Sequence, residues 1–483
     1  MAEHLDGTAA STSSPMPGPD RLLDRSAVSL HGALASGELS AREVTQAALD
    51  AAHAKQDLGA FVHLDPDAAL AQAAALDDAR ATGAEPASLH GMPVAWKDLV
   101  DVAGMPTRYG SAAFSAAGPA AQDDPLVARL RHAGTVVLGK TTVPEFGLDS
   151  YSENRVSAPA RTPLDPTRTA GGSTGGGAAA VAAGVLPFSP GSDGGGSLRI
   201  PAAACGLLSL KPGRGTVPTD RSVDSVRTLV VSGPIAHTAE DAALLLETMT
   251  SPEGLPGRLV EDVRRVRARR EAGERPTSLR IGLTTASPFS PAVEIALARP
   301  ALAALTRAGA LLEAAGHAVD SFSPWYGEDY HRDFRTVWTS GLLDRPLPEG
   351  AERHLGSVAT SFLASARATG PQERAAAVER LEGWARAVRA QFAEQDVVLT
   401  PVLATPPPPV GHFLAMEPEV NYAAQCAFTP YTSMVNVMGL PAVTVPLLRD
   451  EAGLSWSVQL VGRPGTEGPL LGLATDLELL LAA

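Results

Sequence analysis

The chain has few cysteines and few aromatic residues, and both shortages limit what it can be. It holds two cysteines, Cys205 and Cys426, among 483 residues, which cannot form a disulfide framework or a zinc site unaided. Both lie in apolar surroundings, which indicates buried free thiols. Aromatic residues make up only 5% of the chain, but hydrophobic residues of all kinds make up 45%. The composition therefore still predicts a folded protein with a sizeable core.

The chain also lacks a surplus of basic residues and lacks long apolar runs. Its formal net charge is −14 at pH 7, whereas nucleic-acid recognition requires a basic face, so we expect no nucleic-acid partner. No apolar run approaches the roughly 20 residues that cross a bilayer. Residues 1–20 have neither the cationic start nor the apolar stretch of a signal peptide. These absences predict a cytoplasmic protein with no membrane partner, and we interpret residues 1–25 as a disordered tail.

Glycine, by contrast, is concentrated in one stretch, residues 170–211. Two glycine-rich turns there each carry a serine, Ser173 in GGSTGGG and Ser197 in SDGGGSLR. The small apolar residues 178–184 between the turns predict a buried helix. Glycine is costly to order, so a fold retains it where the backbone is strained or closely approached. We interpret the two turns as an active site in which backbone N–H groups face a substrate.

Elsewhere, helical and extended patterns alternate along the chain. Ser40 and Glu43 have the form of a capping box within a helical region at 29–54, and Asp124 followed by Pro125 predicts the start of another helix. Further helices are predicted at 238–249, 301–315 and 372–392, and strands at 60–64, 93–97, 135–138, 280–283, 318–322, 396–400, 440–446 and 456–461. With no internal repeat and no linker, this alternation predicts a single α/β domain over residues 26–483.

The first glycine turn fits two chemistries that we keep as alternatives. Residues 171–175 match G-x-S-x-G, the nucleophile elbow of α/β-hydrolases, which would make Ser173 the nucleophile of an esterase. That fold needs a downstream acid and a histidine. The candidate histidines, none in a recognisable context, are His237, His317, His331, His354 and His412. A phosphate cradle at a helix start is the second alternative, but no lysine stands where a P-loop requires one.

A third interpretation combines both serines with Lys97, which follows an apolar stretch at 93–96. Paired glycines with Ser173, a small-residue helix, the segment SDGGGSLRIP at 192–201, Cys-Gly at 205–206 and Lys-Pro at 211–212 follow one another in a specific order. Shorter matches lie at 93–98, 139–141, 145–147, 439–442 and 459–462. From about residue 29 to its C-terminus, the chain resembles the amidase signature family. The resemblance implies that family's fold, a single large α/β domain with a central mixed β-sheet covered by helices on both faces.

The resemblance also implies a Ser–Ser–Lys catalytic triad. Ser197 would be the nucleophile, Ser173 the bridging serine with a cis peptide bond to Gly172, and Lys97 the base. This assignment is chemically sound, because a serine hydroxyl needs a neighbour to take its proton. A lysine can take that proton when burial lowers its pKa, and Lys97 follows an apolar strand.

The glycines of the second turn would complete the site as an oxyanion hole, formed by the backbone N–H groups of Gly194, Gly195, Gly196 and Ser197. Asp193 and Arg199 would hold this turn without taking part in the reaction. Ser192 stands where the family usually has threonine, which keeps a hydroxyl at that position.

The family resemblance places the substrate pocket in two regions. One is the 141–169 loop, through Phe146 and Gly147, and the other is the aromatic cluster at 325–338, through Trp338. Packing in the core would explain the aromatic residues equally well.

The implied activity is hydrolysis of a C–N acyl bond in a small-molecule substrate through an acyl-enzyme on Ser197. The substrate would be a carboxamide or an anilide, or else a carbamate (urethane). No metal and no organic cofactor are implied, and we expect a monomer or a homodimer. The alternative is the glutaminase subunit of a tRNA-dependent amidotransferase, which shares the signature. Such subunits carry an arginine-containing segment for glutamine, whereas residues 330–347 here are largely aromatic and apolar.

Overall fold

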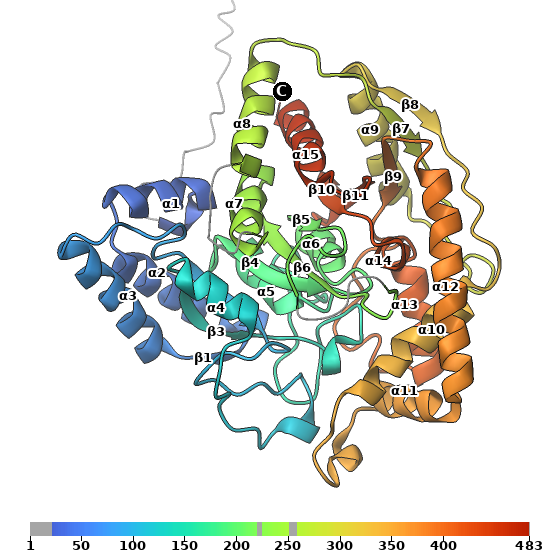
Figure 1. Cartoon of the computed structure of the whole chain (residues 1–483), viewed down its shortest axis with the longest axis horizontal. Helices are drawn as coiled ribbons and strands as arrows, with labels where there is room; N and C mark the ends of the chain where they lie inside the picture. The colour runs from blue at the N-terminus through green and yellow to red at the C-terminus, as the bar shows by residue number, and fades with distance from the viewer. Residues whose placement is uncertain (1–21, 220–224, 251–257, 483) are drawn as a thin grey trace, which may run out of the picture.

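A computed structural model describes residues 22–219, 225–250 and 258–482 (Figure 1). Most of the segment interpreted as a disordered tail, residues 1–21, lies outside the described residues. Leu22–Asp24 form a short 3₁₀ helix. Among the described residues, no helix combines the length and the apolar character needed to cross a bilayer.

The central element is an eight-stranded sheet in the order β4-β6-β5-β10-β11-β9-β7-β8. Neighbouring strands run antiparallel from β4 to β9 and parallel across β9, β7 and β8. The predicted mixed sheet is therefore confirmed. Its strands are β4 (Phe188–Asp193), β5 (Leu208–Lys211), β6 (Val231–Ala236), β7 (Arg280–Leu283), β8 (Ala318–Ser321), β9 (Val397–Pro401), β10 (Ala442–Arg449) and β11 (Ser455–Val461).

A smaller sheet in the order β1-β3-β2 carries the lysine of the predicted triad. Strand β2 (Pro93–Lys97) runs parallel to β3 (Val136–Thr141), which pairs antiparallel with β1 (Phe61–Leu64). β2 packs against β4 of the large sheet. This contact brings Lys97, the last residue of β2, to the end of β4.

Helices cover both faces of the large sheet (Figure 1). α7, α9 and α15 pack on one face, and the short α6 packs on the other over β5, β10 and β11. The helices are α1 (Ala27–Ser36), α2 (Ala41–Ala54), α3 (Pro66–Ala81), α4 (Pro125–His132), α5 (Gly175–Ala182), α6 (Arg199–Cys205), α7 (Ala239–Thr250), α8 (Arg258–Glu271), α9 (Arg299–Ala314), α10 (Tyr330–Ser340), α11 (Ser357–Ala368), α12 (Pro371–Phe392), α13 (Pro418–Phe428), α14 (Ser433–Met438) and α15 (Glu467–Ala482).

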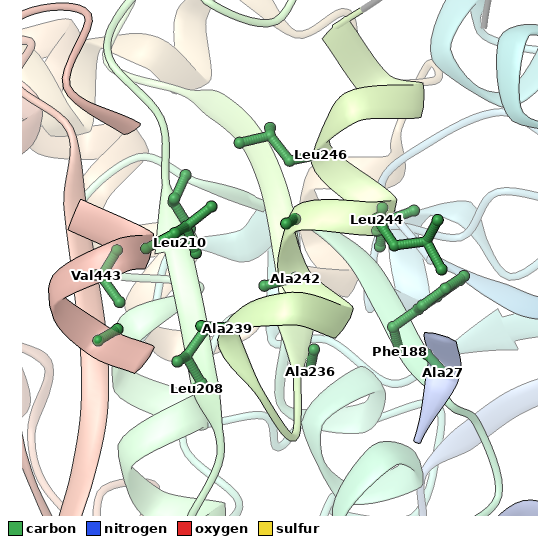
Figure 2. Packing of buried hydrophobic residues seen from close by; sticks show 14 of the residues in the cluster. Ala27, Phe188, Leu208, Leu210, Ala236, Ala239, Ala242, Leu244, Leu246 and Val443 are labelled. Atoms are coloured by element: carbon green, nitrogen blue, oxygen red, sulfur yellow. The ribbon is translucent and has the colours of Figure 1, made fainter. Parts of the chain in front are cut away.

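Side chains of the strands alternate between these two faces, as the twofold repeat of a strand requires. Val443 and Val445 of β10 pack into the core under α7, α9 and α15, and Figure 2 shows Leu208 of β5 beside Ala239 of α7. On β11, Gln459 points the opposite way, toward α6. The sheet therefore presents an apolar face to the core and a partly polar face to the helix that follows the second glycine turn.

The local signals in the sequence are confirmed, and two differences from the predicted elements have a clear cause. Ser40 and Glu43 form the capping box of α2, and Asp124 caps α4. The helical region predicted at 29–54 contains two helices, because Gly37 adopts a left-handed conformation with a φ of 81° and ends α1. Three strands of the large sheet, β4, β5 and β6, were not predicted. The sequence of β4, FSPGSD, has no alternating apolar pattern.

Candidate active site

Lys97 is buried at the point where the two sheets meet, and it contacts both glycine turns. Its Nζ donates a hydrogen bond to Ser173 Oγ at 2.7 Å. The same atom lies 3.1 Å from the carbonyl oxygen and 3.2 Å from the hydroxyl of Ser192, near the end of β4. Only 2% of Lys97 is exposed. The first glycine turn and the end of β4, which lie 76 and 95 positions further along the sequence, thus fix the position of this amino group.

The environment of Lys97 makes its amino group a base near neutral pH. Burial penalises the ammonium form and lowers the pKa of Lys97 to about 7, although the carboxylate of Asp193 acts in the opposite direction. A lysine in water is almost fully protonated at neutral pH. Lys97 can instead exist in its neutral form and accept a proton from Ser173.

The two predicted serines lie beside each other, and one of the two contacts expected within the predicted triad is formed. The peptide bond between Gly172 and Ser173 is cis. The backbone N–H of Thr174 donates to the carbonyl oxygen of Ser197 at 3.2 Å, which joins the two glycine turns. Within the residues that the structure describes, no hydrogen bond connects the hydroxyls of Ser173 and Ser197. The link from Lys97 to Ser173 is therefore present, and the link to Ser197 is open.

The second glycine turn is shaped by Asp193, which uses one of the predicted oxyanion donors. The N–H of Gly196 donates to Asp193 Oδ1 at 2.7 Å. In the described part of the chain, the N–H groups of Gly194, Gly195 and Ser197 have no hydrogen-bond partner. Gly196 has a φ of 130°, and a Cβ at this position would lie 2.4 Å from Thr432 Oγ1, so no other residue fits. Gly196 shapes the turn, and the N–H groups of its neighbours remain available.

A buried ion pair holds Asp193 in place, as expected from the sequence. Arg199 donates from Nε and Nη2 to the two carboxylate oxygens at 3.0 and 2.9 Å, and both side chains are 0% exposed. Asn436 adds a hydrogen bond to the Asp193 carbonyl at 2.8 Å. Burial alone would raise the pKa of Asp193, but the Arg199 guanidinium holds it well below its usual range. The carboxylate therefore stays ionised and keeps its hold on the turn.

Arg199→Met is expected to destabilise the protein by about 3–5 kcal/mol, because it leaves a buried carboxylate without its counter-ion. The measurement is the free energy of unfolding in denaturant, together with the thermal midpoint. Arg335→Met is the matched control. It breaks a partly exposed pair with Glu419, which should contribute less than about 1 kcal/mol. Equal losses in the two variants would contradict the structural role given to Arg199.

A cavity opens at Ser197 and is mostly apolar. Its wall includes Gly172, Gly195 and Ser197 from the two turns. The apolar part of the wall is formed by Leu148, Ile200, Phe289, Phe334, Trp338, Tyr422 and Cys426, and the polar part by Asp149, Ser150, Gln425, Thr429 and Ser433. Such a site suits a small organic molecule that is positioned by a few polar groups.

The structure places the three predicted pocket residues differently. Trp338 lies on the cavity wall, and its ring would be 3.1 Å from a Cβ at Gly194. Phe146 and Gly147 are not among the described residues that line this cavity. Phe146 faces a separate small cavity with Leu342. Gly147 packs against Ser173, whose Oγ would lie 3.4 Å from a Cβ there.

The alternatives based on Ser173 as a nucleophile or on a phosphate cradle gain no support from this geometry. The Ser173 hydroxyl pairs with Lys97, not with a histidine. His237, one of the candidates, contacts the carbonyl oxygen of Val181. The two cysteines are buried free thiols, as predicted.

Several residues of the site were not identified from the sequence as site residues. Ser192, which contacts Lys97, stands inside the recognised motif but was treated only as a conservative replacement. Asn436 holds the glycine turn from 243 positions away. Asp149 and Gln425 lie on the cavity wall 276 positions apart. No spacing rule connects such distant residues, so among these residues only Ser192, inside the motif, offered a signal in the sequence.

Comparisons with known proteins identify the family of this chain. The chain matches the amidase family over residues 43–471. It is 38% identical over 419 residues to AmiB2 of Mycobacterium tuberculosis, a protein named as an amidase, and the match covers 85% of this chain and 86% of that protein. It is also 36% identical over 451 residues to AmiA2 of the same organism, covering 92% and 91% of the two chains. A component of the glutamyl-tRNA(Gln) amidotransferase of Cupriavidus necator is 35% identical over 483 residues, covering 92% and 94%.

The comparison with solved structures indicates the same family. The fold is similar to that of 6-aminohexanoate cyclic dimer hydrolase, with a TM-score of 0.82 and 26% sequence identity, covering 95% of this chain and 98% of that chain. The resemblance seen in the sequence is thereby confirmed over most of its length. The chain belongs to the amidase signature family of carbon–nitrogen hydrolases.

Proposed function

We propose that the protein hydrolyses a small amide through an acyl-enzyme on Ser197, with Ser173 as proton relay and Lys97 as base. One observation carries the proposal: a buried lysine with a pKa of about 7 is hydrogen-bonded to Ser173, beside the turn that bears Ser197. A lysine in this state can accept a proton at neutral pH, which is what a serine nucleophile requires.

The reaction proceeds in two halves. Ser197 Oγ attacks the substrate carbonyl carbon while its proton passes to Ser173, and the Ser173 proton passes to Lys97. The tetrahedral intermediate then collapses, and the C–N bond breaks as the proton returns through Ser173 to the leaving nitrogen. Water repeats the sequence on the acyl-enzyme, releasing the acid and restoring Ser197. The relay requires the Ser197 hydroxyl to turn toward Ser173, and such contacts commonly tighten when substrate binds.

The negative charge of the intermediate would be held by the N–H groups of Gly194, Gly195 and Ser197. These groups have no hydrogen-bond partner among the described residues, and the turn that presents them is fixed by Asp193 and Arg199. Each donor of this kind is worth about 2.7–4 kcal/mol of barrier. Because the donors are fixed before the reaction, they need no reorganisation when the charge develops.

The aromatic wall of the cavity favours substrates with an apolar or aromatic part. Trp338, Phe334 and Phe289 line it together. We propose carboxamides and anilides as the main substrate class, with carbamates as a further class that the same machinery could cleave. Purified protein should therefore release 4-nitroaniline from 4-nitroacetanilide, with Ser197→Ala as the blank.

Methyl 4-nitrophenylcarbamate releases the same chromophore and separates the substrate classes. Release from both compounds would extend the activity to urethanes, whereas release from the anilide alone would restrict it to carboxamides. If the protein cleaved neither of these compounds and no primary amide, that result would contradict the proposed activity of the isolated protein.

The cavity argues against the alternative of a glutaminase within an amidotransferase complex, despite the similarity to a component of one. Glutamine carries a carboxylate, and no arginine or lysine is among the described residues that line the cavity. Arg332 and Arg335 of α10 pair with Asp333 and Glu419 instead. The isolated protein should therefore cleave anilides faster than glutamine.

The pH dependence of the activity should follow Lys97. For an uncharged amide, we expect kcat/KM to fall about tenfold for each pH unit below about 7 and to level off above it, because only the neutral amine accepts the Ser173 proton. The measurement is a pH profile with 4-nitroacetanilide, with the thermal midpoint recorded at each pH. A flat profile between acidic and alkaline pH in folded protein would contradict the role of Lys97.

A further inference from the structure

The cavity at Ser197 has a polar region that the proposed mechanism does not use. Asp149 lies on the cavity wall and is only 7% exposed. Its Oδ1 accepts a hydrogen bond from Gln425 Nε2 at 2.8 Å. In the described part of the chain, Asp149 Oδ2 has no hydrogen-bond or ion-pair partner. This oxygen, which belongs to a largely buried carboxylate on the cavity wall, is therefore free to accept a hydrogen bond.

Gln425 fixes the direction of this carboxylate. Its Oε1 accepts from the backbone N–H of Ser150 at 2.6 Å, and its Nε2 also donates to Asn421 Oδ1 at 2.5 Å. Asn421 is held in turn by the Phe413 carbonyl oxygen at 2.7 Å. Because Ser150 supplies a donor, the amide of Gln425 must present its nitrogen to Asp149. The carboxylate is thus held in one orientation before any ligand binds.

The charge around Asp149 favours a cation. Burial raises the pKa of Asp149 to about 7, and the neighbouring Glu145 and Glu153 add to the rise. No described Lys, Arg or His forms an ion pair with Asp149, and none lines the cavity. A buried carboxylate is stabilised when it gains an opposite charge. A ligand that brings its own positive charge would supply the partner that the protein itself does not.

We propose that Asp149 is a specificity-determining residue that binds a primary ammonium group of the substrate, with Gln425 as its positioning residue. This inference rests on the proposed amidase function and deepens it. The preferred substrate is an amide with an apolar part that can pack against aromatic rings and an ammonium group away from the scissile bond. The apolar part packs against the aromatic wall, and the ammonium donates a hydrogen bond to Asp149 Oδ2. The contact is non-covalent and takes no part in the proton relay.

Two isosteric substrate pairs test the proposal on either side of the scissile bond. The acyl-side pair consists of the 4-nitroanilides of 4-(aminomethyl)benzoic acid and 4-ethylbenzoic acid. The amine-side pair consists of 4-(aminomethyl)acetanilide and 4-ethylacetanilide, both acetylated on the aniline nitrogen. Each pair exchanges an ammonium for a methyl group. At about pH 8, we expect kcat/KM to be at least about tenfold higher for the ammonium member of one pair. No preference in either pair would overturn the proposal.

Asp149→Asn should reduce this ratio to about 1, because asparagine still accepts from Gln425 but lacks the negative charge. Glu153→Gln is the matched control. It removes a buried carboxylate four positions away that is not on the cavity wall, so the ratio should persist. A preference that survives in Asp149→Asn, or that is lost equally in Glu153→Gln, would overturn the proposal.

The wild-type protein provides a test that does not depend on the folding of any variant. The 4-(carboxymethyl)benzoyl anilide places a negative charge where the ammonium would lie, and it should be cleaved more slowly than the 4-ethylbenzoyl compound. If the ammonium preference lies in the acyl-side pair, cleavage of the carboxymethyl compound as fast as or faster than the 4-ethylbenzoyl compound would overturn the role given to Asp149. Failure of the amidase function is distinguishable, because it would abolish Ser197-dependent cleavage of the neutral substrates as well. Cleavage of neutral substrates without charge preference would overturn only the role of Asp149.

Discussion

Ser197→Ala is expected to reduce amide hydrolysis by about 10⁴-fold or more. The substitution removes the oxygen that forms the acyl-enzyme, and Ser197 is the residue of the two glycine turns that brings a hydroxyl to the described cavity wall. The loss should appear in kcat measured with 4-nitroacetanilide. Substrate should still bind, because the aromatic wall and the N–H groups of the turn are unchanged.

Ser189→Ala is the matched control for this loss. Ser189 is a buried serine of the same strand that leads to the glycine turn, and its hydroxyl bonds to the Pro190 carbonyl oxygen, away from the cavity. Its removal should leave kcat close to that of the wild type. Substantial turnover by Ser197→Ala in folded protein would exclude the acyl-enzyme on Ser197.

Lys97→Met is expected to reduce kcat/KM by about 10³-fold while the protein remains at least as stable as the wild type. The activity falls because no base remains to receive the proton of Ser173. The stability does not fall, because the folded state already penalises the ammonium form of Lys97. A pKa lower in the folded than in the unfolded state means that protonation favours unfolding, so stability at neutral pH is reduced by this lysine. Methionine fills a similar volume without that penalty.

Lys211→Met separates the catalytic effect from the general effect of removing a buried lysine. Burial also lowers the pKa of Lys211 to about 7, but its Nζ bonds to the Pro212 carbonyl oxygen at 2.7 Å rather than to a serine. Activity should be largely retained in this variant. Comparable losses of kcat/KM in the two variants would contradict the assignment of Lys97 as the base. A lower thermal midpoint for Lys97→Met alone would contradict the penalty that burial places on its ammonium form.

Together, these two predictions test different parts of the same relay. The serine variant removes the group that forms the covalent bond, and the lysine variant removes the group that accepts the proton. Because Ser173 connects the two, the combined variant should be no worse than Ser197→Ala alone. Additive losses would mean that Lys97 acts outside the relay.

The residues of the proposed triad could be named from the sequence because each stands in a local motif that resembles the amidase signature. Ser173 and Ser197 lie in glycine-rich turns, and Lys97 follows a short apolar strand. The chemistry requires these residue types in these settings, so the motifs carry the information within a few positions. An α/β fold was expected because helical and extended patterns alternate along the chain, and the mixed sheet was expected from the resemblance to the amidase signature family.

The substrate cavity was not predictable in the same way. Trp338 was one of three residues expected there, but Phe146 turned to a second cavity and Gly147 packed against Ser173. Asp149 and Gln425 contact each other across 276 positions, and neither belongs to a motif. Whether a side chain faces a cavity or the core depends on how α10 and α13 pack onto the glycine turns. Local sequence does not contain that information.

By itself, the sequence identified the residues of the proposed chemistry: a lysine and two serines in fixed local settings, and glycines where the backbone must be approached closely. The tertiary structure decided the rest. It buried Lys97 between two sheets and thereby lowered its pKa, and it committed the N–H of Gly196 to Asp193. It also placed the carboxylate of Asp149 on the cavity wall with no cationic partner among the described residues. Each of these properties arises from burial and from contacts between distant segments, which exist only once the chain has folded.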